Sequence, residues 1–232
     1  MAKGVFSNTE IFKAIEDKQI VCYPFVEEHV NTTSMDIRLG EHYYRIAEHR
    51  NDAVVFNPFD EEHVRKHFEH KRAVPLYQAL GSLALGELRN YPKDHLVIPL
   101  GPHERILGHT YEFIGVANEG TTSMQARSTV GRSGINVCQD AGWGDTGYIN
   151  RWTMEIYNNN DRLVLLPVGW RIAQIVFFHA NNVQGEYSQD TGKYQNLKAK
   201  DIDQIIKSWQ PSDMLPKAYK DKIQDYNPLE CD

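Results

Sequence analysis

The sequence predicts a mainly β fold, and two observations support this class, the short apolar runs and the turn residues between them. From His95 onward the chain is a succession of short apolar runs, and glycine, asparagine, aspartate or proline separates nearly every run from the next. Several short strands at near-regular spacing are typical of a β-sandwich or barrel and not of a parallel sheet with helical crossovers. The chain is also large enough to bury a core, since it has 232 residues and 41% of them are hydrophobic.

The N-terminal segment predicts a short helix followed by strands. Ser7 can accept a hydrogen bond from the backbone N–H of Glu10, and the Glu10 side chain can reach back, which is the pattern of a capping box. We expect this helix to end near Asp17. Residues 20–23 then form a strand-like run that a proline stops, and residues 35–40 alternate apolar and polar side chains as a half-buried strand does.

Six further strands are expected in the β-rich part of the chain. They cover residues 96–100, 112–116, 134–138, 152–157, 163–167 and 172–178.

Two stretches look like additions to a single domain that spans residues 1–232. Residues of about 50–95 are interrupted by prolines, and the dense charge over 60–72 predicts a short exposed helix or loop within an insertion. Residues of about 198–232 form a polar C-terminal extension, with a short helix expected at 201–209. The β domain is therefore expected to carry peripheral helical additions.

Composition argues against several classes of protein. The formal net charge is −6 and the pI is near 5.9, which disfavours a nucleic-acid polymer or an acidic membrane as the partner. No apolar run approaches the ~18–20 residues that span a bilayer. The three cysteines form no CxxC pair, so neither a disulfide framework nor a thiolate zinc site is indicated, and we expect a reducing, cytoplasmic compartment.

The basic side chains of the β-rich part are all arginines. No lysine occurs between Asp94 and Gly192, and Arg127 and Arg132 bracket hydroxyl groups and a glycine. Guanidinium forks, O–H donors and a close backbone approach suit an oligophosphate. Structural ion pairs within the sheets are the alternative explanation for these arginines.

A glycine-rich turn and a glutamate follow the arginines. The turn at residues 140–148 includes Asp145, and Glu155 lies further on between Met154 and Ile156 in an apolar strand. A glutamate between apolar neighbours in a strand commonly points to solvent. The alternative is a glutamate in a dry pocket, where desolvation raises the pKa of the carboxyl and makes it a competent general base.

In this order and spacing, the segments resemble the dCTP deaminase family, part of the superfamily of trimeric dUTPases. Five motifs and a closing segment similar to the family's nucleotide-covering segment carry the resemblance, which spans roughly residues 7–40 and 95–197. The motifs are Ser34–Gly40, Arg127–Gly134, Ala141–Tyr148, Thr153–Asn158 and Val168–Phe177, and the closing segment contains Tyr187 and Gly192–Gln195. Asn150 departs from the family pattern, which usually has glycine there. The resemblance implies a dUTPase-like distorted β-barrel or jelly-roll.

The resemblance also implies a chemistry. It is the zinc-independent hydrolytic deamination of dCTP to dUTP and ammonia, which feeds dUMP and dTTP synthesis. Glu155 would be the general base that activates water, assisted by Ser128, Arg132 and the carbonyl of Ala141. The implied nucleotide-binding residues are Arg127, Ser128, Thr129, Val130, Gly131, Arg132, Asp145, Tyr148, Thr153, Met154, Glu155, Gln174, Tyr187 and Lys193. Mg²⁺ would bind through the triphosphate without protein ligands, and active sites would form between the subunits of a homotrimer.

Several alternatives to a deaminase that forms dUTP stay open. A bifunctional enzyme would convert dCTP to dUMP and pyrophosphate, since Asp145 stands where the diphosphatase branch of the superfamily has its base. A dUTPase alone and a module that binds a nucleotide without turning it over are further possibilities. Outside this class, His63, His67 and His70 have the i, i+4 and i+3 spacings of a metal site on one helical face.

Overall fold

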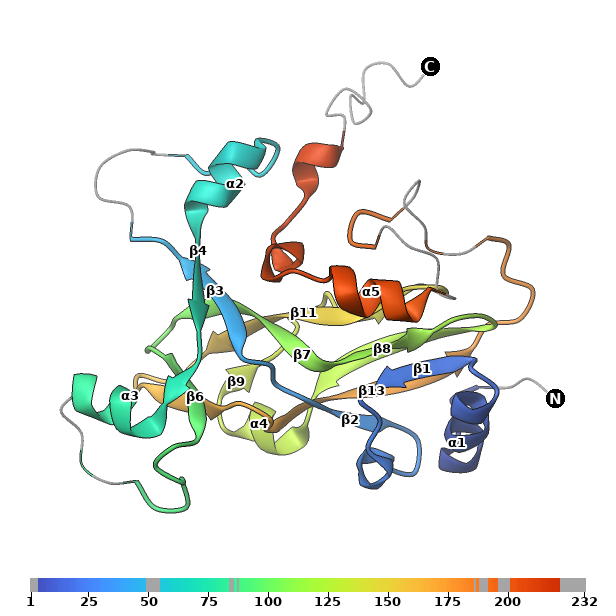
Figure 1. Cartoon of the computed structure of the whole chain (residues 1–232), viewed down its shortest axis with the longest axis horizontal. Helices are drawn as coiled ribbons and strands as arrows, with labels where there is room; N and C mark the ends of the chain where they lie inside the picture. The colour runs from blue at the N-terminus through green and yellow to red at the C-terminus, as the bar shows by residue number, and fades with distance from the viewer. Residues whose placement is uncertain are drawn as a thin grey trace.

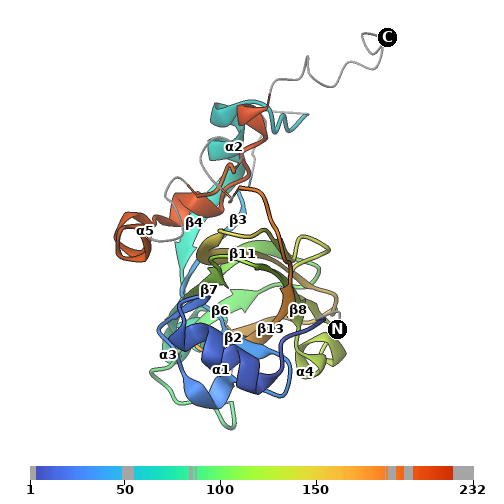
Figure 2. The same ribbon diagram turned by 90° about the vertical axis from the view of Figure 1, so that its right-hand side faces the viewer.

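The computed structural model describes residues 4–48, 55–83, 86, 88–185, 187, 192–195 and 201–221. Within them the chain is mainly β, and a larger sheet faces a smaller one in a jelly-roll-like arrangement, as predicted (Figure 1). In the side view, β7 and β11 lie above β13 and β2 (Figure 2). The two sheets and a third, three-stranded sheet do not close into a continuous barrel over this part of the chain.

The larger sheet has six strands in the order β4-β3-β7-β11-β9, with β1 also paired to β7. Its bounds are β1 Ile20–Tyr23, β3 His42–Ile46, β4 Phe68–Arg72, β7 Arg105–Val116, β9 Ile135–Asn136 and β11 Ile149–Asn158. All the pairings in this sheet are antiparallel.

Two smaller sheets complete the β structure. The four-stranded sheet has the order β10-β8-β13-β2, and the three-stranded sheet has the order β12-β6-β5. Their bounds are β2 Met35–Arg38, β5 Val74–Pro75, β6 Leu96–Leu100, β8 Gly120–Ala126, β10 Trp143–Gly144, β12 Val164–Pro167 and β13 Arg171–His179.

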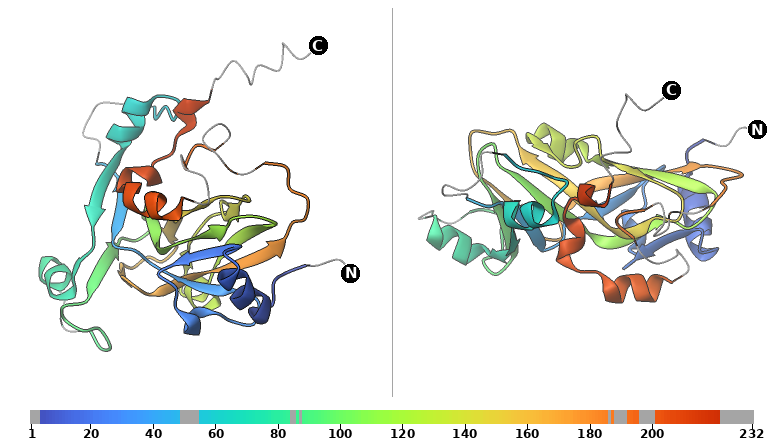
Figure 3. Two further views of the ribbon diagram at one scale, coloured as in Figure 1. Left: turned by 45° about the vertical axis from the view of Figure 1, so that its right-hand side comes forward. Right: turned by 90° about the horizontal axis from the view of Figure 1, so that it is seen from above.

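The helices lie around the sheets and not between them (Figure 3). The α-helices are α1 Asn8–Glu16, α2 Glu61–His67, α3 Leu76–Ser82, α4 Ser128–Arg132 and α5 Ile202–Ser208, and the 3-10 helices are η1 Glu27–His29, η2 Pro211–Met214 and η3 Ala218–Lys220. No helix in the described part of the chain is long and apolar enough to cross a membrane.

The main core fills the space between the two facing sheets. Alternate side chains of β11 point into it, and Trp152, Met154 and Ile156 are almost completely buried. Met124 of β8 and Phe177 of β13 meet them from the opposite sheet. The other side chains of β11 consequently lie on the outer face of the larger sheet, where the functional site is found.

Most of the predicted elements are confirmed, and two segments differ from the prediction. The Ser7–Glu10 capping box is present, and the helix that it begins ends at Glu16. The charged segment 60–72 forms α2 and then β4, which pairs with β3 and adds an edge to the larger sheet. Strand β8 was not predicted, because its side chains are mostly polar. It is stabilised by pairing with β10 on one edge and β13 on the other.

The insertion and the C-terminal extension pack on the domain and on each other. Met214 and Leu215 of the extension are buried against Tyr44 of β3, Val64 of α2 and Leu107 of β7. Helix α5 and the segment after it run above β11 and end beside α2 (Figures 1 and 2). The additions therefore cover part of the outer face of the larger sheet.

Candidate active site

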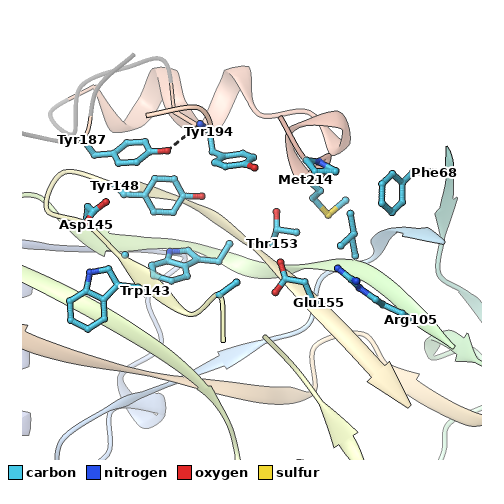
Figure 4. Close-up of a pocket in the computed structure, with 15 residues that line it drawn as sticks. Phe68, Arg105, Trp143, Asp145, Tyr148, Thr153, Glu155, Tyr187, Tyr194 and Met214 are labelled. Carbon is cyan, nitrogen blue, oxygen red and sulfur yellow. Dashed lines mark hydrogen bonds between the residues drawn. The ribbon is translucent and has the colours of Figure 1, made fainter. Parts of the chain in front are cut away.

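A pocket of about 290 Å³ lies on the outer face of β7 and β11. Figure 4 shows Trp143, Asp145, Tyr148 and Tyr187 at one end of this pocket and Glu155 toward the other end. The side chains around Glu155 are Arg105 and Leu107 of β7, Thr153 of β11, Phe68 of β4, and Met214 and Pro216 of the extension.

Strand register brings Glu155 and its neighbours to the same face. Glu155 stands directly opposite Leu107, and Arg105 stands opposite the next residue but one, Tyr157, so Arg105 and Glu155 are diagonal neighbours. Alternation does direct Glu155 away from the core, as the solvent-face interpretation requires. That face is covered by the extension and by Phe68, so Glu155 lies in a pocket, as the other interpretation requires.

The Glu155 carboxyl is poorly solvated. Burial raises its pKa, while hydrogen bonding to its own backbone N–H and the positive charge of Arg105 lower it. Its Oε2 atom is buried and has no hydrogen-bond partner among the described residues. A buried carboxyl oxygen without a partner is costly, and a bound water or a substrate group would satisfy it.

The glycine-rich turn supplies the other end of the pocket. The N–H of Met124 donates to the carbonyl of Gly142 at 2.7 Å, and a Cβ at Gly142 would lie 2.2 Å from the Met124 oxygen, so only glycine fits. Gly147 has a φ of +88°, which glycine adopts without strain. This backbone presents Asp145 at the pocket mouth, and it leaves the Tyr148 ring edge-on to Tyr187 at 5.0 Å.

Residues 194 and 195 bind to the pocket walls at the Tyr187 end. The backbone N–H of Tyr194 donates to the Tyr187 hydroxyl at 3.2 Å. Gln195 accepts from the N–H of Ile149 at 2.7 Å and donates to the carbonyl of Gly147 at 2.8 Å. Asn150, the departure from the family pattern, donates to the carbonyl of Tyr194 at 3.0 Å. The segment is thus held to the start of β11 by amide side chains.

The single chain brings together only part of the predicted site. Ala141, Asp145, Tyr148, Thr153, Glu155 and Tyr187 line the pocket. The remaining predicted residues do not line it: Arg127, Ser128, Thr129, Val130, Gly131, Arg132, Met154, Gln174 and Lys193.

These remaining residues lie in four different places. Met154 is fully buried in the core, and Gln174 lies on β13 opposite Asp36. Lys193 forms an ion pair with Asp221 of the extension. The others, residues 127–132, form α4 and the residue before it.

The α4 segment has one buried side and one exposed side. Arg127 and Arg171 both pair with the buried carboxylate of Asp36, each at 3.2 Å, so the structural ion-pair explanation holds for these two arginines. Val130 packs into the core. Arg132 is exposed and makes no ion pair within the described part of the chain.

Several pocket residues were missed from the sequence. Arg105, Phe68, Leu107, Met214 and Pro216 lie outside the motifs that drew attention to the site, and Tyr194 lies in the closing segment but was not singled out. Trp143 is inside the glycine-rich turn, and its ring is 62% exposed and stacks on Phe178. The tryptophan within the glycine-rich turn was the sequence signal that could have marked Trp143 as a pocket residue.

The proposed histidine metal site is not formed as the helical spacing suggested. His63 and His67 lie on α2, but the helix ends at His67 and His70 lies on β4. The His67 ring stacks on Phe56, and His70 is within hydrogen-bond distance of His42 at 3.1 Å. No group of three or more metal-ligating side chains was found among the residues that the structure describes.

Comparisons with other proteins agree with the motifs. A sequence profile of the family described as dCTP deaminase-like matches residues 5–180. A protein of Nanoarchaeum equitans called "dCTP deaminase, dUMP-forming" is 25% identical over 206 residues, which cover 88% of this chain and 99% of that relative. A protein of Methanopyrus kandleri with the same name is 29% identical over 196 residues, covering 82% and 90%.

A solved structure supports the fold. The 2′-deoxycytidine 5′-triphosphate deaminase of Agrobacterium tumefaciens superposes with a TM-score of 0.53 at 16% identity. The match covers 78% of this chain and 49% of that one, so the chain spans about half the length of that deaminase.

Proposed function

The chain belongs to the dCTP deaminase-like family, and from this premise we propose that it deaminates dCTP and carries the product on to dUMP. The observation that supports deamination is the buried carboxyl of Glu155, which has an unsatisfied oxygen and a raised pKa and lies in a pocket with Asp145 and Tyr148. The sequence alone favoured dUTP as the product. The relatives that are named dUMP-forming favour the bifunctional alternative instead.

In the proposed first reaction Glu155 is the general base. It takes a proton from a water molecule, and the resulting hydroxide adds to C4 of cytosine. The C4–N4 bond then breaks and the amine leaves as ammonia with the proton that Glu155 returns. The proton of the C4 hydroxyl ends on N3, so that a C4 carbonyl remains. The carbonyl of Ala141 and the hydroxyl of Thr153, both at the pocket, would hold the water and the base.

In the proposed second reaction a water molecule adds to the α-phosphorus of dUTP. The bond to the bridging oxygen of the leaving pyrophosphate breaks, and dUMP remains. Asp145 is exposed at the pocket mouth, where it can accept a proton from this water or a hydrogen bond from the 3′-hydroxyl. Mg²⁺ would enter with the triphosphate and neutralise part of its charge.

The distribution of cations supports assembly as a homotrimer with sites between subunits. Arg105 is the one cation among the described residues that line the pocket, and a triphosphate carries several negative charges. Arg132 and the hydroxyls of Ser128 and Thr129 are exposed on α4, away from this pocket. We propose that α4 of one copy completes the pocket of another, where Ser128 and Arg132 would act beside Glu155.

The decisive experiment is to incubate the protein with dCTP and Mg²⁺ and to resolve dUTP, dUMP, pyrophosphate and ammonia. We expect ammonia, pyrophosphate and dUMP in equal amounts. Accumulation of dUTP would favour the monofunctional deaminase. No product would refute deamination, and a second incubation with dUTP would then distinguish a dUTPase, which releases pyrophosphate, from the binding module, which does not. The zinc-independent chemistry and the cytoplasmic location predicted from the sequence are part of this proposal.

Replacing Glu155 by Gln tests the general base. Glutamine keeps the size of the side chain but cannot take a proton, so we expect ammonia release to fall by about 10²–10⁴-fold. Binding of dCTP, measured by calorimetry, should change little. The exposed Glu119→Gln is the matched control, and unchanged turnover in Glu155→Gln would refute the mechanism.

A further inference from the structure

The guanidinium of Arg151 on β11 lies against three aromatic rings. Its guanidinium carbon lies 4.7 Å from the ring centre of Trp209, 4.9 Å from that of Phe113 and 5.9 Å from that of Tyr111. In the described part of the chain it makes no ion pair, and its Nε atom is buried without a hydrogen-bond partner. Of the three rings, only Trp209 belongs to the C-terminal extension. The extension is therefore attached to β11 through a cation–π contact.

A buried histidine also contacts Trp209. The ring centres of His109 and Trp209 are 4.8 Å apart. Burial lowers the pKa of His109 to about 3, so its imidazole is neutral. Its Nδ1 donates to the carbonyl of Thr110 at 2.8 Å, and its Nε2 accepts from the N–H of His42 at 3.2 Å. Trp209 thus packs against an imidazole whose orientation is set by two hydrogen bonds to the backbone of the larger sheet.

The chain that follows Trp209 reaches the Glu155 end of the pocket. Helix η2 places Met214 over β7, where it is 3% exposed and packs with Leu107, the residue directly opposite Glu155. Met214 and Pro216 both line the pocket (Figure 4 labels Met214 beside Phe68 and Arg105). Without this segment, the outer face of β11 at Glu155 would be open to solvent.

We propose that Trp209 is a positioning residue, which fixes the extension across β7 and β11 and thereby shields Glu155 from bulk solvent through Met214 and Pro216. This inference rests on the proposed function, because it concerns the environment of the general base. The extension is a part of the chain beyond the profile match, which ends at residue 180. A segment outside the shared motifs would thus control the basicity of a motif residue.

The extension acts on Glu155 by excluding solvent and not by its own charges. The ionisable groups around Glu155 all come from other elements: Arg105 of β7, Cys138, Asp145 and Tyr148 around the glycine-rich turn, and Tyr187 and Tyr194. On the extension, Asp213 and Lys217 pair with each other at 3.4 Å. Removing the Trp209 contact should therefore change the hydration of Glu155 and leave the charges around it in place.

The test compares Trp209→Ala with Trp209→Phe and with Tyr77→Ala, whose side chain is exposed on α3. The titration of the Glu155 carboxyl is followed by ¹³C NMR, assigned with Glu155→Gln, and amide exchange is measured at Met214 and Leu215. In Trp209→Ala we expect exchange to accelerate at least tenfold and the pKa of Glu155 to fall toward its ordinary value. Trp209→Phe should restore most of both values, and Tyr77→Ala should match the wild type.

Met214→Ala provides a second variant that keeps the Trp209 contact. Here the pKa of Glu155 should fall while amide exchange in the rest of the extension stays slow. The inference is overturned if Trp209→Ala leaves the extension protected, or if exchange accelerates and neither variant moves the titration. Both measurements are made without turnover, so a wild-type protein that releases no ammonia would refute the proposed function and leave this test intact.

Discussion

At the level of single residues, opposed influences act on the pKa of Glu155. Desolvation is the largest and raises the pKa of the carboxyl, whereas the hydrogen bond from its own backbone N–H and the positive charge of Arg105 favour the ionised form and lower the pKa. A general base works best when its pKa is close to the operating pH, because it must be ionised and still bind the proton of water. Arg105, together with the backbone N–H of Glu155, therefore keeps the desolvated carboxyl usable as a base.

Replacing Arg105 by Gln should shift the pH dependence of the reaction. Without the guanidinium, the pKa of Glu155 rises further, and a larger fraction of the carboxyl is protonated and inactive at a given low pH. The acid limb of kcat/KM for ammonia release should move to higher pH, opposite to the shift expected for Trp209→Ala. The measurement is the full pH profile, with the exposed Arg162→Gln as control. An unchanged acid limb would show that Arg105 has no influence on the base, and a shift to lower pH would show an influence opposite to the one expected.

At the level of elements, the sequence predicted those helices and strands that are stabilised by interactions between residues close together in the chain. The helix at residues 8–16 was predicted because Ser7 and Glu10 satisfy each other's backbone N–H groups, and this depends only on a few adjacent residues. Strand β8 was missed because Thr121 and Thr122 are stabilised by partners about 20 and 55 residues away, including Gly144 and Phe177. Pairing over such distances leaves little trace in a short window of sequence.

The capping box gives a direct measure of one such local interaction. The N–H of Ser7 donates to Glu10 Oε2 at 2.9 Å, and Ser7 Oγ accepts from the N–H of Glu10 at 3.4 Å. Ser7→Ala removes the hydroxyl acceptor, so we expect unfolding to require about 1 kcal/mol less in a urea titration. Ser7→Thr keeps a hydroxyl and should lie close to the wild type. Equal losses for the two variants would show that the cap hydrogen bond is not responsible.

The pocket shows the same limit at the level of elements. The sequence singled out Asp145 and Glu155 because a glycine-rich turn and a carboxylate in an apolar strand are recognisable within one segment. The wall around Glu155 was missed, because Phe68 and Met214 belong to segments whose overall charge suggests an exposed surface. Their burial depends on the insertion and the extension packing together, which only the three-dimensional arrangement reveals.

At the level of the whole molecule, charge is divided between two regions of the surface. The pocket contains Asp145, Glu155 and one arginine, while α4 presents an exposed Arg132 elsewhere on the same chain. A nucleotide triphosphate needs both a carboxylate for the chemistry and cations for its phosphates. Closed symmetric assembly can join the two, since each copy offers its pocket to one neighbour and its α4 to the other.

Mixing two inactive variants tests this assembly. Glu155→Gln removes the base and Arg132→Gln removes the cation, so each homotrimer should have lost most of its ammonia release. In a trimer refolded from equal amounts of both, a site is intact when its pocket comes from Arg132→Gln and its α4 from Glu155→Gln. Random assembly makes about one quarter of the sites intact, and we expect about a quarter of wild-type activity to return. If both residues acted within one chain, every site would lack one of them and the mixture would stay inactive.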